Sequence, residues 1–172
     1  MTEQGRSPVD RYFAGLAEST FQTQLGVVDP PLIDYVSNLL IRFIRSDVVH
    51  RLRSVTGQPL MSVPEMIAEA SSRLGDAQRE IHQHIGDFTL FWAGVYPEAL
   101  RRESTRFESY CSEGRRAYRI ASSIQSSDEN APESGVLHRM SDNFDLCCYG
   151  LREVRRQWED GDGLAPGSIL LN

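Results

Sequence analysis

The chain has 172 residues and a formal net charge of −6, with 40% hydrophobic and 24% charged residues. This length and composition are typical of one globular domain with its own hydrophobic core. The 18 basic residues are all arginine, which excludes Schiff-base and other lysine chemistry. Because the net charge is negative, we do not expect the chain to bind nucleic acid or anionic membrane surfaces nonspecifically.

The cysteines and the N-terminal segment indicate a compartment. Cys111, Cys147 and Cys148 form an odd set with one adjacent pair, which is not the pattern of a disulfide framework. Residues 1–11 are polar and lack the apolar centre of a signal peptide. No apolar run approaches the roughly 20 residues that a membrane-spanning helix needs. We therefore expect a cytoplasmic protein without membrane insertion.

Three helix-start signals occur in the first half of the chain. Residues 7–10 (Ser-Pro-Val-Asp) and 29–31 (Asp-Pro-Pro) each combine a capping side chain with a proline in the first helical turn. Residues 62–65 (Ser-Val-Pro-Glu) form a capping box. We expect the first helix to end at Gly26, and the third to hesitate at Gly75 and resume as a central helix.

The central helix is predicted over Gln78–Tyr96, where residues become apolar on nearly every face, as in a helix buried on all sides. Two further helices are predicted over Ser104–Gln125 and Leu137–Trp158, and no alternating strand pattern appears. The sequence therefore predicts an all-α, single-domain bundle of five or six helices over residues 1–163. The residues expected to be deeply buried are Phe88, Trp92, Phe144, Cys147 and Leu151.

A short apolar tail follows the last helix at residues 164–172. Ile169, Leu170 and Leu171 are three consecutive apolar residues, and burying them would be favourable. We expect them to dock into a groove on their own domain, on a second copy or on a partner, and a solvated tail is the alternative.

Candidate metal ligands lie on two helices. Asp76, Glu80, His84 and Asp87 share one face of the central helix, and a second set follows on the last helix. The second set consists of His138, Asp142 and Asp145. These side chains point away from the predicted core, and neither helix carries the Glu-x-x-His pair of di-iron bundles. We therefore expect a solvated charged face and no cofactor, with Glu80, His84 and Asp87 as metal ligands under the alternative hypothesis.

Asp87 directly precedes the most apolar stretch of the central helix. A carboxylate buried there needs a partner, because an unpaired buried charge is very costly. We expect an ion pair with Arg115, Arg116 or Arg119, and the alternative is an acid that orients a ligand in a pocket.

Two further features could carry chemistry. Trp92, Tyr96, Tyr110 and Tyr118 could line a ligand pocket between two helices, although aromatic residues at helical spacing usually form the core. Cys148 sits beside the apolar stripe and could be exposed, with Arg152 one turn away to favour its thiolate. For all three cysteines, inert packing is the favoured interpretation.

The segment Gly86-Asp87-Phe88…Leu90-Phe91…Gly94-Val95-Tyr96-Pro97-Glu98, followed by Tyr110…Gly114…Ala117-Tyr118, resembles a family of uncharacterised helical proteins from bacteria. The likeness covers roughly residues 25 to 125. It implies a bacterial, cytosolic, all-helical protein and carries over no catalytic residue.

No catalytic or nucleotide-binding motif appears in the chain. The sequence favours a non-enzymatic helical module that binds another protein or itself. The alternative is a small-ligand or metal-dependent helical-bundle enzyme that uses Glu80, His84 and Asp87. A third possibility is a local nucleic-acid-binding patch at the arginine pairs 101–102 and 115–116.

Overall fold

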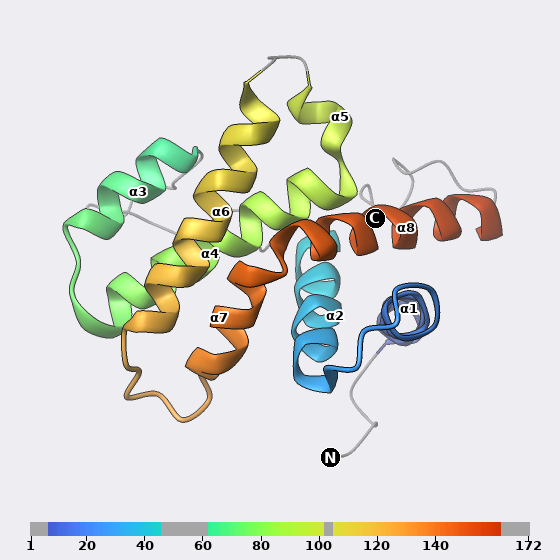
Figure 1. Ribbon diagram of the computed structural model, residues 1–172, viewed down its shortest axis with the longest axis horizontal. Helices are drawn as coiled ribbons and strands as arrows, with labels where there is room; N and C mark the ends of the chain where they lie inside the picture. The colour runs from blue at the N-terminus through green and yellow to red at the C-terminus, as the bar shows by residue number, and fades with distance from the viewer. Residues whose placement is uncertain (1–6, 46–61, 102–104, 163–172) are drawn as a thin grey trace.

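The computed structural model describes residues 7–45, 62–101 and 105–162, which form eight α-helices, one π-helical segment and no strand (Figure 1). The elements are α1 (Pro8–Ser19), the π-helix η2 (Thr20–Gln24), α2 (Pro30–Ile44), α3 (Val63–Ser71), α4 (Gly75–Val95), α5 (Pro97–Leu100), α6 (Arg106–Ser123), α7 (Ser134–Asp142) and α8 (Phe144–Asp162). The predicted all-α class is confirmed. The expected five or six helices were too few, because two of the expected helices are each interrupted and α5 is a further short helix.

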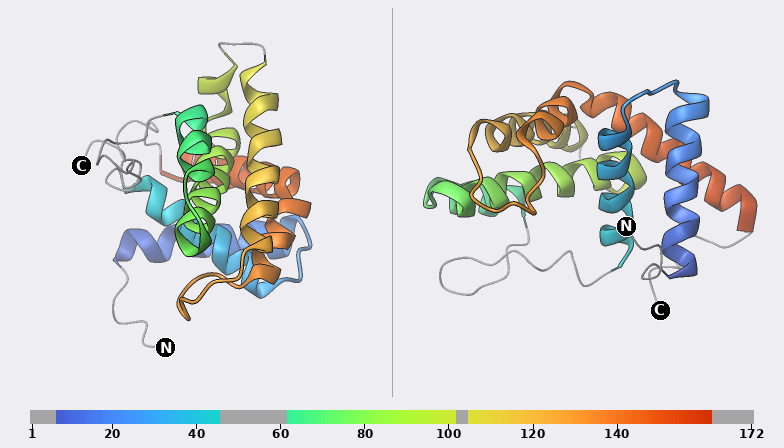
Figure 2. Two further views of the ribbon diagram at one scale, coloured as in Figure 1. Left: turned by 90° about the vertical axis from the view of Figure 1, so that its left-hand side faces the viewer. Right: turned by 90° about the horizontal axis from the view of Figure 1, so that it is seen from below.

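Helix α4 is the centre of the arrangement. Figures 1 and 2 show α3 and α6 packed along its N-terminal part and α8 crossing its C-terminal end, with α2 between α4 and α1 and with α1 also against α8. In the part of the chain that the structure covers, no helix is both long and apolar enough to cross a lipid bilayer.

The three predicted helix starts are confirmed. The Ser7 hydroxyl accepts a hydrogen bond from the Asp10 amide at 3.2 Å, and the Asp10 carboxylate accepts from the Ser7 amide. Ser62 and Glu65 form the same reciprocal pair at the start of α3. Asp29 caps α2 by accepting from the Leu32 amide at 3.2 Å. Each of these ends is specified by local side chains alone, which is why the sequence was sufficient to place it.

Two expected helices are interrupted: one near Gly75, where a hesitation was expected, and one at Asn143, which was not predicted. Helix α3 ends at Ser71, α4 begins at Gly75 with a positive φ of 61°, and Leu74 between them is 86% exposed. Asn143 separates α7 from α8, and both its backbone amide and its side-chain amide donate to the Arg139 carbonyl at 2.9 Å. The apolar stripe nevertheless continues across this bend, since Met140, Phe144 and Cys147 are all buried.

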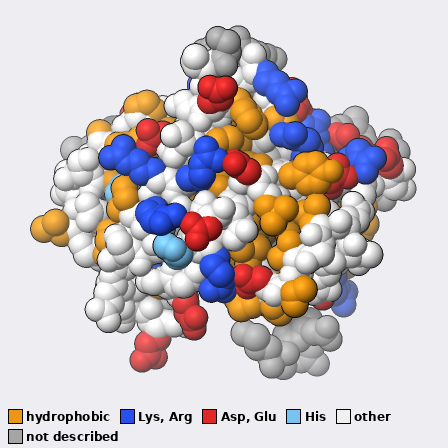
Figure 3. All heavy atoms as spheres, in the orientation of Figure 1, with side chains coloured by type: hydrophobic (Ala, Val, Ile, Leu, Met, Phe, Trp, Pro, Cys, Tyr) orange, Lys and Arg blue, Asp and Glu red, His pale blue; other side chains and the backbone are white. Residues whose placement is uncertain are grey.

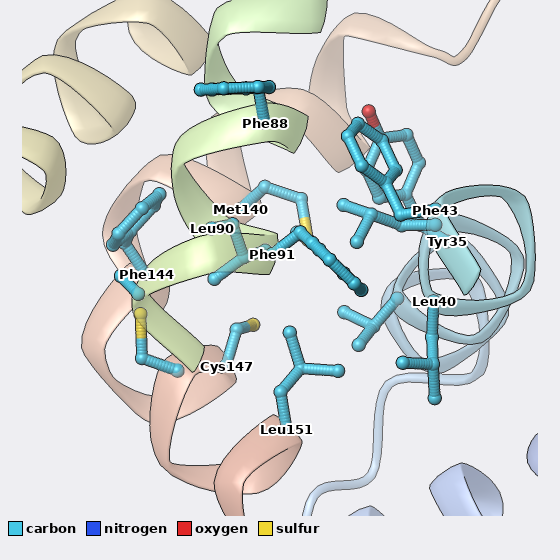
Figure 4. Close-up of a cluster of buried hydrophobic side chains, with 14 of the residues drawn as sticks. Tyr35, Leu40, Phe43, Phe88, Leu90, Phe91, Met140, Phe144, Cys147 and Leu151 are labelled. Atoms are coloured by element: carbon cyan, nitrogen blue, oxygen red, sulfur yellow. The ribbon is translucent and has the colours of Figure 1, made fainter. Parts of the chain in front are cut away.

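The core lies between α4 and the helices on either side of it. Figure 4 shows side chains of α4 between those of α7 and α8 on one side and those of α2 on the other. Phe88, Phe144, Cys147 and Leu151 are buried as predicted. The prediction for Trp92 was wrong: it is only half-buried, and its ring packs against those of Phe88, Phe91 and Tyr96 at the margin of the core.

Glycines on α4 allow the neighbouring helices to approach closely. A Cβ atom added at Gly86 would lie 2.6 Å from the ring of Tyr118 on α6, and one at Gly94 would lie 2.9 Å from the Leu151 Cβ on α8. Both distances are shorter than packed carbon atoms tolerate, so these crossings require glycine.

We predict that Gly86→Ala lowers the free energy of unfolding by about 1–3 kcal/mol, because the buried Tyr118 ring must move away from the new methyl group. Gly15→Ala is the matched control, since a Cβ there meets nothing within 4 Å. It should stabilise α1 by roughly 0.5–1 kcal/mol. Urea unfolding followed by circular dichroism measures both changes, and equal effects of the two substitutions would contradict this account of the α4–α6 crossing.

Candidate functional site

A polar network is buried between α2, α4 and α6 around Asp87, which is 1% exposed. The hydroxyls of Tyr35 and Tyr118 both donate to Asp87 Oδ1, at 2.6 and 2.7 Å. Arg42 Nη2 donates to Oδ2 at 3.1 Å and supplies the compensating charge. The carboxylate therefore has three donors, which is the condition under which a charge can be buried.

The predicted need of Asp87 for a partner is confirmed, but the predicted partner was wrong. Arg115 pairs with Asp145 and Arg119 pairs with Asp142, both near the protein surface. The Asp87 side of α4 faces α2, so the cation comes from there, a relation that helical periodicity alone does not determine.

The two tyrosines are held in their neutral forms. Burial and the neighbouring Asp87 carboxylate raise the pKa of Tyr35 and of Tyr118 well above the usual value of 10.0. A neutral hydroxyl is the form that can donate to the carboxylate, so the pKa shifts and the hydrogen bonds support each other.

A cavity of about 550 Å³ opens beside this network, between α2, the N-terminal half of α4 and the α6–α7 loop (residues 124–133). The views of Figures 1 and 2 show this loop beside the N-terminal end of α4. The cavity is lined by Arg42 from α2, by Asp76, Arg79, Glu80, Gln83, His84 and Asp87 from α4, and by Ser126, Asp128, Asn130, Ala131 and Pro132 from the loop.

Arg79 and Asp76 hold the loop against α4. Arg79 is 3% exposed and donates to the carbonyls of Ile124 and Pro132, at 2.9 and 2.5 Å. The Asp76 carboxylate accepts hydrogen bonds from the amide and the hydroxyl of Ser127. These contacts fix both ends of the loop, so one wall of the cavity is preformed.

His84 and Glu80 are two cavity groups on α4 with spare bonding capacity. His84 Nε2 is buried and has no hydrogen-bond partner among the described residues. Burial lowers the pKa of His84, an effect that Arg42 reinforces and Asp87 opposes, so the imidazole is neutral near pH 7. Glu80 lies one turn before His84, is exposed, and forms no hydrogen bond or ion pair within the described segments.

The predicted metal ligands Glu80, His84 and Asp87 do line one cavity, together with Asp76. Both Asp87 oxygens, however, already accept hydrogen bonds from protein donors. Across residues 7–45, 62–101 and 105–162, no three His, Cys, Asp or Glu side chains are grouped so that they could hold a metal ion.

The second predicted set lies at the surface, in ion pairs. His138 Nε2 is 3.4 Å from an Asp142 oxygen, Asp142 also pairs with Arg119, and Asp145 pairs with Arg115. Arg115 is therefore already paired, and Arg102 of the other predicted basic pair lies outside the described residues.

The four aromatic residues predicted as a possible pocket pack instead with other aromatic rings. Trp92 and Tyr96 contact each other at 5.7 Å between ring centroids, and Tyr110 contacts Phe88 at 6.2 Å. Tyr118 is fully buried and bonded to Asp87. Tyr118 thus belongs to the core, and Trp92, Tyr96 and Tyr110 are half-buried side chains that pack against it.

Two further predictions concern the cysteines and the tail. Cys148 is buried rather than exposed, because its side of α8 packs against α6. The tail residues Ile169, Leu170 and Leu171 lie outside the described part of the chain, so the docking of the tail stays a prediction.

Comparisons with protein-family models, with curated proteins and with solved structures found no match for this chain. The resemblance to helical bacterial proteins therefore also stays a prediction, and the candidate site is identified from its geometry alone.

We predict that Asp87→Asn lowers the free energy of unfolding by about 3–5 kcal/mol, because it breaks a buried ion pair and places an amide where donors converge. Asp145→Asn is the matched control: its ion pair with Arg115 is exposed and should contribute less than about 1 kcal/mol. Urea unfolding of both variants tests this, and a stability loss for Asp87→Asn as small as that of the control would contradict the assignment.

The raised pKa values of Tyr35 and Tyr118 predict that the folded state loses stability at alkaline pH. A group whose pKa is raised by folding stabilises the folded state fully below its unfolded pKa, here about 10, and this contribution is lost as the pH rises above that value. Tyr35 and Tyr118 should therefore ionise only as the protein unfolds. Tyrosinate absorbance and circular dichroism, followed together from pH 9 upward, measure this. Ionisation of all six tyrosines near pH 10 with an unchanged dichroism spectrum would contradict it.

Proposed function

We propose that the protein is a non-enzymatic binding protein that holds a small polar ligand in the cavity beside Asp87. The observation that carries the proposal is the unpartnered Nε2 of His84, a residue that lines the cavity one helical turn from the unpaired Glu80 carboxylate. Buried polar atoms are normally hydrogen-bonded, so a lone acceptor or donor in a preformed cavity is a site where a ligand gains a bond.

The charges in the cavity favour a ligand with a cationic, N–H-bearing group. Four carboxylates line the cavity against two arginines, so the formal charge is two units negative while His84 is neutral. Arg42 is neutralised by Asp87, and Arg79 is occupied by loop carbonyls. Asp76 and Asp128 accept hydrogen bonds from the loop, whereas Glu80 has no donor among the described residues. An ammonium or guanidinium group could therefore donate both to Glu80 and to His84.

Isothermal titration with agmatine and putrescine tests the proposal, with succinate and Zn²⁺ as contrasting ligands. Glu80→Gln should weaken binding of the amines about 10- to 100-fold, since a hydrogen bond to a charged group contributes roughly 1.5–3 kcal/mol. Glu108→Gln on α6, which lies outside the cavity, is the matched control and should bind as the wild type does. Binding of succinate alone, of Zn²⁺ alone, or of none of these ligands would contradict the proposed ligand class.

A protein–protein interaction is the second proposed function, supported by apolar side chains that face solvent. Leu146 and Tyr149 lie about one turn apart on α8 and are 36% and 50% exposed. Figure 3 shows hydrophobic side chains gathered along α8 on the face drawn there. Light scattering of the wild type and of a Leu146→Ser/Tyr149→Ser variant tests self-association through this face. A cytoplasmic location belongs to both proposals and is supported by the free thiols of the three cysteines.

A further inference from the structure

A shallow hollow of about 460 Å³ lies where α7 packs against α6. It is lined by Ser112, Arg115, Arg116 and Arg119 from α6 and by Ser141 and Asp142 from α7. Among the described residues, none lines both this hollow and the cavity beside Asp87. Figure 3 shows arginine side chains gathered among a few carboxylates on the face that carries α6 and α7. The hollow therefore concentrates positive charge on a chain whose net charge is −6.

Ser141 is 4% exposed and ties α7 to α6 at this hollow. Its hydroxyl donates to the Arg115 carbonyl at 2.8 Å and accepts a longer hydrogen bond from Arg119 Nε at 3.4 Å. Arg119 Nη2 also donates to Asp142 at 2.6 Å, and Arg115 Nη1 donates to Asp145 at 2.5 Å. Two of the three guanidinium groups are therefore held in place before a ligand arrives, which lowers the entropy cost of binding.

The three arginines keep most of their donors available. A guanidinium group has five N–H donors, of which Arg115 uses one and Arg119 uses two in the contacts above. Arg116 is exposed and forms no hydrogen bond or ion pair with any described residue. Since the carboxylates of Asp142 and Asp145 offset two of the three arginines, the charge of Arg116 is left for a ligand.

We propose that this hollow binds the dianionic phosphoryl group of a small phosphate monoester. The three terminal oxygens of such a group accept hydrogen bonds in several directions, which suits a hollow lined by three arginines and a serine. The volume lies within the range of small-molecule sites, so the remainder of the ligand has room beside the phosphoryl group. The inference is independent of the proposed amine binding, because the two sites use different residues.

The carboxylates at the hollow favour a compact monoester over a nucleic acid. Asp142 lines the hollow, and Asp145 is held next to it by its ion pair with Arg115. A backbone of linked phosphates would place further negative charges near these carboxylates, and the acidic chain as a whole would repel it. A single monoester carries a charge of about −1.5 to −2 near pH 7, whereas each phosphodiester carries one charge and has one terminal oxygen fewer.

Nuclear magnetic resonance of the full chain, titrated with glycerol 3-phosphate, tests the position of the site. We expect shift changes concentrated at the backbone amides of residues 112–119 and 139–142. Inorganic phosphate should act on the same amides with lower affinity, since it leaves the rest of the hollow empty, and acetate should have no effect. Changes spread over the whole surface, an equal response to acetate, inorganic phosphate bound as tightly as the monoester, or binding of oligothymidine alone would each overturn the proposal.

Isothermal titration of variants with glycerol 3-phosphate tests the residues. Arg116→Gln should weaken binding about 10- to 100-fold, and circular dichroism should show it folded, because Arg116 is exposed. Arg11→Gln is the matched control: it changes the net charge equally at an exposed position on α1 and should bind as the wild type does. Asp145→Asn releases Arg115 and should strengthen binding about 2- to 5-fold. Equal losses in the two arginine variants, wild-type binding by Arg116→Gln, or no gain in Asp145→Asn would contradict the assignment.

Discussion

The buried charge of Asp87 is the constraint on which the rest of the structure depends. A carboxylate at 1% exposure is tolerable only with donors on every side, and here they come from two other helices. Tyr35 and Arg42 tie α2 to α4, and Tyr118 ties α6 to α4. The absence of a side chain at Gly86 lets the Tyr118 ring lie against α4 and reach the carboxylate. Satisfying this charge therefore fixes how three helices pack.

The ion pair between Asp87 and Arg42 also determines which charges are available in the cavity. Arg42 is partly exposed, and it places its charge at the cavity wall while Asp87 neutralises it from below. Arg79 is committed to loop carbonyls, so neither arginine offers a free charge to an anion. What remains available is the neutral His84 and the unpaired Glu80, which is why we expect a ligand that donates hydrogen bonds and carries positive charge.

The sequence was sufficient wherever structure is determined within one or two helical turns. The capping side chains Ser7, Asp29 and Ser62 and the faces of α4 and α8 follow from local chemistry and period. The predicted face carrying Glu80, His84 and Asp87 does line one cavity. Tyr35 and Arg42 were missed as partners of Asp87, although their spacing of seven residues on α2 places them on one face. Which helix covers that face, and which loop closes over it, depends on packing between distant segments.

The most direct test of the central claim is a double-mutant cycle between Asp87→Ala and Tyr118→Phe, measured by urea unfolding. If the tyrosine hydroxyl donates to an ionised carboxylate, as the 2.7 Å contact indicates, the two changes should be coupled by about 1.5–3 kcal/mol. Additive effects, with a coupling energy near zero, would show that the network around Asp87 does not hold α4 and α6 together and would contradict the account.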